Sequence, residues 1–142
     1  MSEHSEIAVK LFREGYNCAQ AVFAAFCDET GLDRETALKL SSSFGGGMGR
    51  MGEVCGAVSG MLMTAGALYG CPDPKNSSAK AEHYRLVRQL AQRFREGNGS
   101  ILCRELLHPS GDGPKKHSCA ELVGCAAEMM DEELRRKHRA AD

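Results

Sequence analysis

The stretch FGGGMGRMGEVCGAVSGMLMTAGALYG, residues 44–70, decides how the rest of the chain is interpreted. A glycine-rich loop leads into a run without charged residues from Val54 to Pro72, and Cys55 lies where the two meet. Each glycine inside a helix costs about 1 kcal/mol relative to alanine. A helix this rich in glycine therefore needs compensation, either from a closely packed neighbour or from chemistry at the cysteine.

The uncharged run predicts a buried central helix over about Glu53–Tyr69. Within it Gly56, Gly60 and Thr64 recur at four-residue spacing, which places small residues on one face and lets another helix approach closely. The run is long enough to be weighed as a membrane span. Its glycines and hydroxyl residues dilute the hydrophobicity, however, and no second span is present, so we expect no membrane span.

Helical periodicity runs along the whole chain, and no stretch alternates like a half-buried strand. We predict one all-α domain over residues 1–142, with about six to seven helices around the central glycine-rich helix. Cap and stop residues define the other expected helices: one ending at Gly15, one from Asn17 to Gly31, one over about 34–43, one over about 77–96, a short one after Ser100, and a last one that starts at Ser118 and runs toward Arg136.

Composition excludes several classes of protein. Lys and Arg (18) nearly balance Asp and Glu (19), so the basic face that nucleic-acid-binding proteins carry is missing. The first residues, MSEHSEIAVKLFREG, contain early acidic residues and no apolar core, unlike a signal peptide. We therefore expect a cytoplasmic protein. Seven cysteines in that compartment favour catalytic, redox or metal-binding thiols over structural disulfides.

Four cysteines fall in the first turn of an expected helix. First-turn amide groups have no partner within the helix, and the helix dipole is positive at this end, so a thiolate is stabilised there. Such positions lower the cysteine pKa from about 8.5 to roughly 3.5–7.5. The candidate site residues are Cys18, Cys55, Cys103 and Cys119.

The remaining cysteines have simpler interpretations. Cys27 and Cys125 lie inside expected helices and are predicted to be small buried hydrophobic residues. Cys71 lies at a helix C-terminus, where the dipole disfavours a thiolate.

Four motifs in order carry a family resemblance: NCAQAV, FGGGMGRMGEVCGAVSG, ILCREL and CAELV. Together they resemble the C_GCAxxG_C_C family of small redox-active proteins over roughly Gly15 to Glu128. That family is marked by four cysteines and a C-G-A-x-x-G motif, which is CGAVSG at residues 55–60 here. Its cysteines correspond to the same four residues selected by helix position. The resemblance implies a redox role.

Two chemistries remain open for these four cysteines. In the first, Cys55 is the nucleophile of a thiol–disulfide oxidoreductase-like protein, and a second cysteine resolves the mixed disulfide formed with a redox partner or small molecule. In the second, all four thiolates bind zinc or an iron–sulfur cluster. His108 and His117 are further candidate metal ligands.

The loop itself offers a third hypothesis, anion or nucleotide binding, because residues 47–52 read G-x-G-x-x-G. The dinucleotide fingerprint requires a preceding strand, whereas residues 38–44 are expected to be helical, so the match is weak. Its candidate cofactor-binding residues are Gly45, Gly46, Gly47, Gly49, Arg50 and Gly52. A non-enzymatic interaction module, with the small-residue face forming a homodimer, is the remaining alternative.

Overall fold

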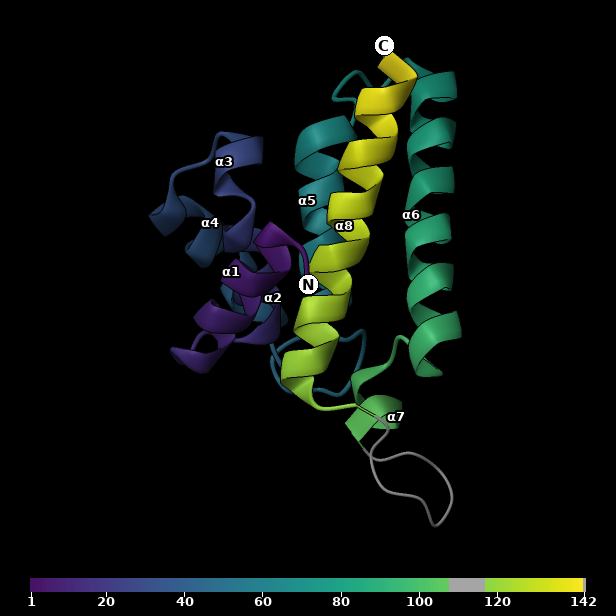
Figure 1. Ribbon diagram of the computed structural model, residues 1–142. Coiled ribbons are helices and arrows are strands. Elements are labelled where there is room, and N and C mark those ends of the chain that lie inside the picture. Colours follow the sequence, from purple (N-terminus) through teal and green to yellow (C-terminus); the bar gives the residue numbers. More distant parts are fainter. Residues whose placement is uncertain (108–116, 142) are drawn as a thin grey trace.

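The computed structural model describes residues 1–107 and 117–141. Within these ranges the chain forms eight α-helices, a short 3-10 turn and no β-strand, which confirms the predicted all-α fold (Figure 1). The elements are α1 (Glu3–Arg13), α2 (Cys18–Ala25), α3 (Cys27–Thr30), α4 (Arg34–Ser41), η1 (Ser42–Phe44), α5 (Gly56–Tyr69), α6 (Ser77–Asn98), α7 (Cys103–Leu107) and α8 (Cys119–Ala141).

Cap residues fix the helix boundaries in the first half of the chain. The Asn17 side chain accepts a hydrogen bond from the Gln20 backbone N–H, and the Gln20 side chain accepts one from the Asn17 backbone N–H, forming the expected capping box. Gly31 ends α3 in the left-handed conformation, with φ of 78°. Asp33 caps α4 through the backbone N–H of Thr36.

The helix predicted from Asn17 to Gly31 is wrong in one respect, because it is broken into α2 and α3. The backbone leaves the helical conformation at Phe26, with φ of −102° and ψ of 18°. Phe26 is fully buried, and its ring stacks on the His4 ring with centroids 4.3 Å apart. The break redirects the chain while this aromatic ring stays in the core, a tertiary contact that local helix propensity cannot register.

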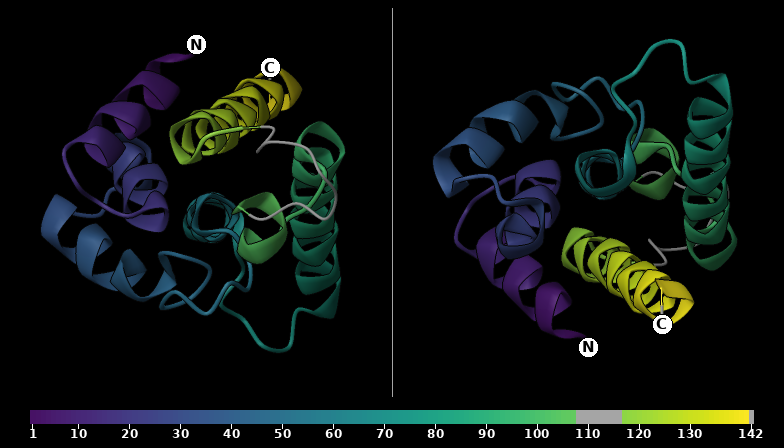
Figure 2. Two further views of the ribbon diagram at one scale, coloured as in Figure 1. Left: turned by 90° about the horizontal axis from the view of Figure 1, so that it is seen from below. Right: turned by 90° about the horizontal axis from the view of Figure 1, so that it is seen from above.

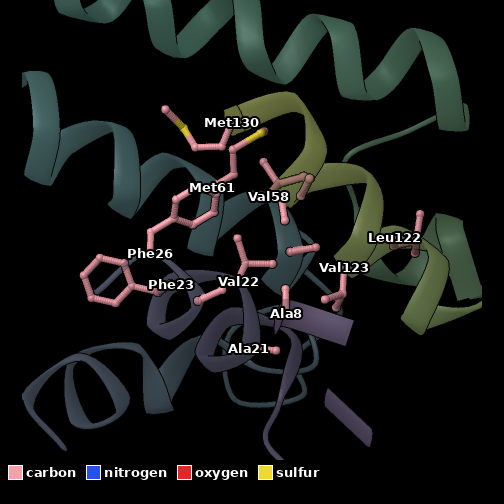
Figure 3. Close-up of a cluster of buried hydrophobic side chains, with 14 of the residues drawn as sticks. Ala8, Ala21, Val22, Phe23, Phe26, Val58, Met61, Leu122, Val123 and Met130 are labelled. Carbon is pink, nitrogen blue, oxygen red and sulfur yellow. The ribbon is translucent and has the colours of Figure 1, made fainter. Parts of the chain in front are cut away.

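The hydrophobic core lies where α1, α2, α5 and α8 meet (Figure 3). Val22 of α2, Val58 and Met61 of α5, and Val123 and Met130 of α8 are all fully buried within it. Seen along its axis, α5 lies between α2, α6 and α8 (Figure 2). None of the helices within residues 1–107 and 117–141 has both the length and the apolar character needed to cross a bilayer.

Helices α2 and α5 pack unusually closely, because glycine removes side-chain bulk between them. A methyl group on Gly60 would lie 2.7 Å from the Ala19 carbonyl oxygen and 3.0 Å from Val22 Cβ. A methyl group on Gly56 would lie 3.1 Å from both the Ala19 nitrogen and Cys18 Cβ. The small-residue face of α5 therefore faces the beginning of α2.

We predict that Gly60→Ala lowers the free energy of unfolding by about 1–3 kcal/mol, because the added methyl group overpacks against the α2 backbone. Gly66→Ala is the matched control in the same helix, since a methyl group there meets nothing within 4 Å. It should raise the free energy of unfolding by up to about 1 kcal/mol through helix propensity alone. Denaturant unfolding measures both, and equal effects of the two substitutions would contradict the close packing.

Candidate functional site

A short antiparallel pairing brings Cys55 beside Cys103. The Cys103 backbone N–H donates to the Glu53 carbonyl at 2.6 Å, and the Cys55 N–H donates to the Ile101 carbonyl at 2.7 Å. Val54 and Leu102 form an isolated β-bridge between these bonds. Two cysteines that are 48 residues apart in the sequence are thereby fixed on adjacent backbone segments.

Close packing of α2 on α5 adds Cys18 to this pair. The Cys18 Cβ would lie only 3.1 Å from a methyl group on Gly56, the residue directly after Cys55, so Cys18 is next to Gly56. The Cys18 thiol is also hydrogen-bonded to Cys119 at the start of α8. The glycine loop and the starts of α7 and α8 lie at the same end of the molecule (Figure 1).

All four cysteines predicted at helix starts lie there in the structure, but the central helix begins at Gly56 and not at the predicted Glu53, because residues 53–55 pair with residues 101–103. Cys18, Cys103 and Cys119 are the first residues of α2, α7 and α8, and Cys55 is the residue that precedes α5. Ionised Cys55, Cys103 and Cys119 all act electrostatically on the Cys18 thiol. The structure therefore gathers these four side chains into one group, which we call the four-cysteine site.

Burial changes the expected chemistry of Cys55. This residue is only 4% exposed, and desolvation raises the pKa of its thiol to about 11. The backbone N–H groups of Ala57 and Val58 at the start of α5 oppose the shift without cancelling it. The expectation that a helix start lowers the pKa of Cys55 is thus wrong, because desolvation outweighs the helix-end amides.

The pKa of Cys18 is also raised well above its ordinary value. Its hydrogen bond with Cys119 is the largest cause, followed by burial and then by repulsion from Cys55, Cys119 and Cys103 in their ionised forms. Cys18 and Cys55 therefore keep their protons near pH 7 unless a cation or an oxidation removes them.

The other cysteines take no part in the group. Cys71 is exposed after the end of α5. Cys27 and Cys125 were predicted to be buried inside helices, but both are only partly buried against the core, and Cys27 is the first residue of α3. Burial raises the pKa of the Cys27 thiol, with Asp28 contributing in the same direction.

The glycine loop is a left-handed turn that covers the four-cysteine site. Five consecutive residues have positive φ, including the non-glycine residues Met48 (68°) and Arg50 (65°); the run is Gly46, Gly47, Met48, Gly49 and Arg50. The amide groups of residues 48–53 donate to carbonyls of residues 43–48, for example Gly49 to Ser43 at 2.8 Å. These six amides are therefore already bonded, which weakens the hypothesis of a phosphate-binding loop.

Gly47 gives the loop its contact with the site. It is buried with φ of 73°, and a methyl group on it would lie 2.7 Å from Cys103 Cβ and 2.6 Å from the Glu53 nitrogen. Only glycine satisfies both the backbone conformation and this space. The exposed side chain of Arg50 lies in the same turn.

Only one of the two histidines proposed as further metal ligands lies within the described residues. His117 is part-exposed, and its Nδ1 lies 3.1 Å from Glu121 Oε2 within the first turn of α8. His108 lies outside the described residues.

Sequence reasoning missed the pairing of residues 52–55 with 101–104, which places Cys103 beside Cys55. Four residues without alternating hydrophobicity give no strand signal. It also missed the contact of Gly47 with Cys103, because a glycine's tertiary neighbour leaves no local pattern.

Comparison with known proteins identifies a family for this chain. Residues 16–133 match the family model described as "Putative redox-active protein (C_GCAxxG_C_C)". An "Uncharacterized protein" from Archaeoglobus fulgidus is 28% identical, with 86% of this chain and 87% of that protein aligned. No solved structure matches the chain.

The chain therefore belongs to the C_GCAxxG_C_C family. The fold explains the glycines of the family motif CGAVSG, residues 55–60. Gly56 makes room for Cys18, and Gly60 makes room for the α2 backbone.

We predict that Gly47→Ala opens the four-cysteine site, because its methyl group displaces either Glu53 or Cys103. Gly49→Ala is the matched control, since it has a similar φ of 58° but meets nothing within 4 Å. Both substitutions should cost about 1–2 kcal/mol from left-handed strain. Only Gly47→Ala should add a further loss of stability and faster alkylation of Cys103, as measured by peptide mass spectrometry. The same alkylation rate in both variants would argue against this contact.

Proposed function

We propose that Cys18, Cys55, Cys103 and Cys119 form one redox centre that binds an iron–sulfur cluster. The observation that carries the proposal is the convergence of four cysteine side chains from four separate segments, with Cys55 and Cys103 buried and the other two partly buried. A four-thiolate ligand set is the one that iron–sulfur clusters and structural zinc use.

The redox character of the family favours iron over zinc. Zinc has no accessible second oxidation state, whereas an iron–sulfur cluster accepts and donates single electrons. When bound, such a cluster would supply this electron transfer. The protein's part is to provide the thiolate ligands, to exclude water through the glycine loop, and to hold Cys103 against Gly47.

The electrostatics of the site also support cation binding. Cys18 and Cys55, whose pKa values are raised, are poor nucleophiles near pH 7, and a buried Cys55 is poorly placed to attack a large substrate. A bound metal ion reverses this situation, because it removes the thiol protons outright and neutralises the repulsion. The features that weaken Cys55 as a nucleophile therefore suit it as a ligand.

A specific contact supports a second candidate function, reversible disulfide formation between Cys18 and Cys119. The two thiols are hydrogen-bonded and so lie in contact. Oxidation would form one S–S bond and release two protons and two electrons to an external disulfide, which would be reduced to two thiols. This disulfide would covalently tie the start of α2 to the start of α8.

The experiment that separates these functions is anaerobic purification, followed by a visible spectrum, iron and sulfide analysis, and a count of alkylatable thiols with and without reductant. We expect absorbance from sulfide-to-iron charge transfer and protection of four cysteines from alkylation. A protein free of iron and sulfide, also after reconstitution under reducing conditions, would overturn the cluster proposal. If two further thiols then appear only after reduction, the disulfide function is supported.

Substitution of single cysteines gives the matched prediction. Cys18→Ser should reduce iron and sulfide content several-fold, because one of four ligands is lost. Cys27→Ser should leave the content unchanged, since Cys27 lies in α3 outside the site. Circular dichroism of both variants checks that the helices still form. Equal iron loss in the two variants would contradict the assignment of ligands.

A further inference from the structure

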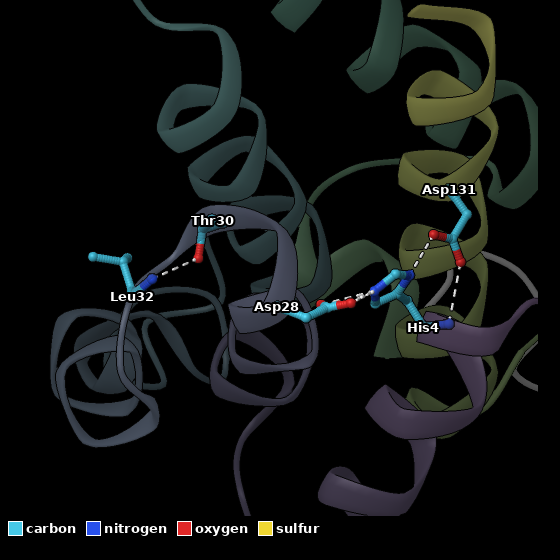
Figure 4. Close-up of polar contacts among 5 residues, drawn as sticks. All are labelled: His4, Asp28, Thr30, Leu32 and Asp131. Carbon is cyan, nitrogen blue, oxygen red and sulfur yellow. Dashed lines mark hydrogen bonds and ion pairs between the residues drawn. The ribbon is translucent and has the colours of Figure 1, made fainter. Parts of the chain in front are cut away.

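A second group of metal-ligating side chains lies outside the four-cysteine site, where α1, α3 and α8 meet (Figure 4). His4, in the first turn of α1, is buried. Its Nδ1 lies 2.6 Å from Asp131 Oδ1 on α8, and its Nε2 lies 2.9 Å and 3.0 Å from the two carboxylate oxygens of Asp28 on α3. Both ring nitrogens therefore face carboxylates.

The imidazole ring of His4 is held in one orientation. Its face stacks on Phe26 with an interplanar angle of 15°. Asp131, itself buried, also accepts a hydrogen bond from the His4 backbone N–H at 3.2 Å. A histidine that donates Nδ1–H to a buried carboxylate directs Nε2 to the opposite side, which is the arrangement that orients metal-bound histidines; here Nε2 points at the Asp28 carboxylate.

The Nε2 side of the ring opens toward the surface. Asp28 and Glu29, consecutive residues of α3, are exposed, so an ion can reach this side from solvent. One ligand atom each from His4, Asp28 and Glu29 lies within 4.8 Å of the other two. The His4 Nε2 and Asp28 Oδ1 atoms, 2.9 Å apart, have the spacing of neighbouring ligands around a single first-row metal ion, whose bonds are about 2.0–2.2 Å long.

We propose that His4 Nε2 and the carboxylates of Asp28 and Glu29 bind one divalent first-row transition-metal ion, with Asp131 as the positioning residue. Two carboxylates balance the charge of the ion, and the remaining positions accept water. Bound here, the ion would replace the proton that Nε2 shares with Asp28 in the metal-free arrangement. It would link α1 to α3, while Asp131 links the same histidine to α8.

The donor atoms distinguish this site from the four-cysteine site. Nitrogen and oxygen ligands suit Mn²⁺, whereas sulfur ligands select softer ions and iron–sulfur clusters. Mn²⁺ is therefore the probe. The loss of its free-ion signal in electron paramagnetic resonance, on titration into the full-length protein, measures binding.

We expect one Mn²⁺ per chain, with the affinity reduced about tenfold or more in Asp28→Asn and in Glu29→Gln, since each removes a ligand. Both residues are exposed, so the fold should tolerate these changes. Glu35→Gln, an exposed acidic residue on α4 that pairs only with Lys39 in the described part of the chain, should bind as the wild type does.

Asp131→Asn tests the positioning role, and the expected loss of Mn²⁺ affinity is about 10–100-fold. Circular dichroism shows whether the Asp131→Asn variant folds. If it does not fold, Asp28→Asn and Glu29→Gln decide whether the site binds Mn²⁺. Undetectable binding at millimolar Mn²⁺, or equal affinity in the wild type, Asp28→Asn and Glu29→Gln, would overturn the proposal. The group would then be a hydrogen-bonded His–Asp network without a metal.

Discussion

The close approach of α2 to α5 is the constraint on which the rest of the structure depends. Gly56 and Gly60 leave no side chain between the two helices, so the α5 surface lies directly against Ala19. This packing places the first residue of α2, Cys18, beside the residue that precedes α5, Cys55. The two glycines destabilise the isolated α5 helix, but they allow more of the α2 and α5 surfaces to be buried against each other. They also set the relative position of Cys18 and Cys55.

The four-cysteine site combines two physical conditions that are unfavourable together for free thiolates. Burial removes water from Cys55, and mutual repulsion among the cysteines opposes more than one negative charge. Both conditions become favourable when a cation is bound, because coordination compensates for desolvation and neutralises the charge. Proteins whose cysteines act as exposed nucleophiles show the opposite arrangement, with a lowered pKa and access to solvent.

The glycine loop shows how local strain supports this arrangement. Met48 and Arg50 adopt left-handed backbone conformations at a cost of about 1–2 kcal/mol each. Hydrogen bonds within the loop, such as that from Glu53 to the Gly47 carbonyl at 2.9 Å, hold the turn closed. The closed turn holds Gly47 in contact with Cys103. Strain of this kind is typical of functional sites, where the surrounding structure enforces it.

Much of this protein could be predicted from the sequence because the relevant signals are local. Helical periodicity gave the all-α fold, the Asn17 and Asp33 caps began their helices where predicted, and the placement of four cysteines at helix starts is confirmed. The break at Phe26 was missed, because it follows from a ring buried against His4 rather than from any neighbouring residue.

The sequence by itself determined which cysteines lie at helix starts, since capping and periodicity depend on residues a few positions apart. Only the tertiary structure decided that these thiols meet, that Cys55 is buried, and that the pKa values of Cys18 and Cys55 rise instead of falling. The same holds for His4, whose partners lie 24 and 127 residues away. Desolvation and long-range contacts depend on how the helices pack, and no local pattern encodes them.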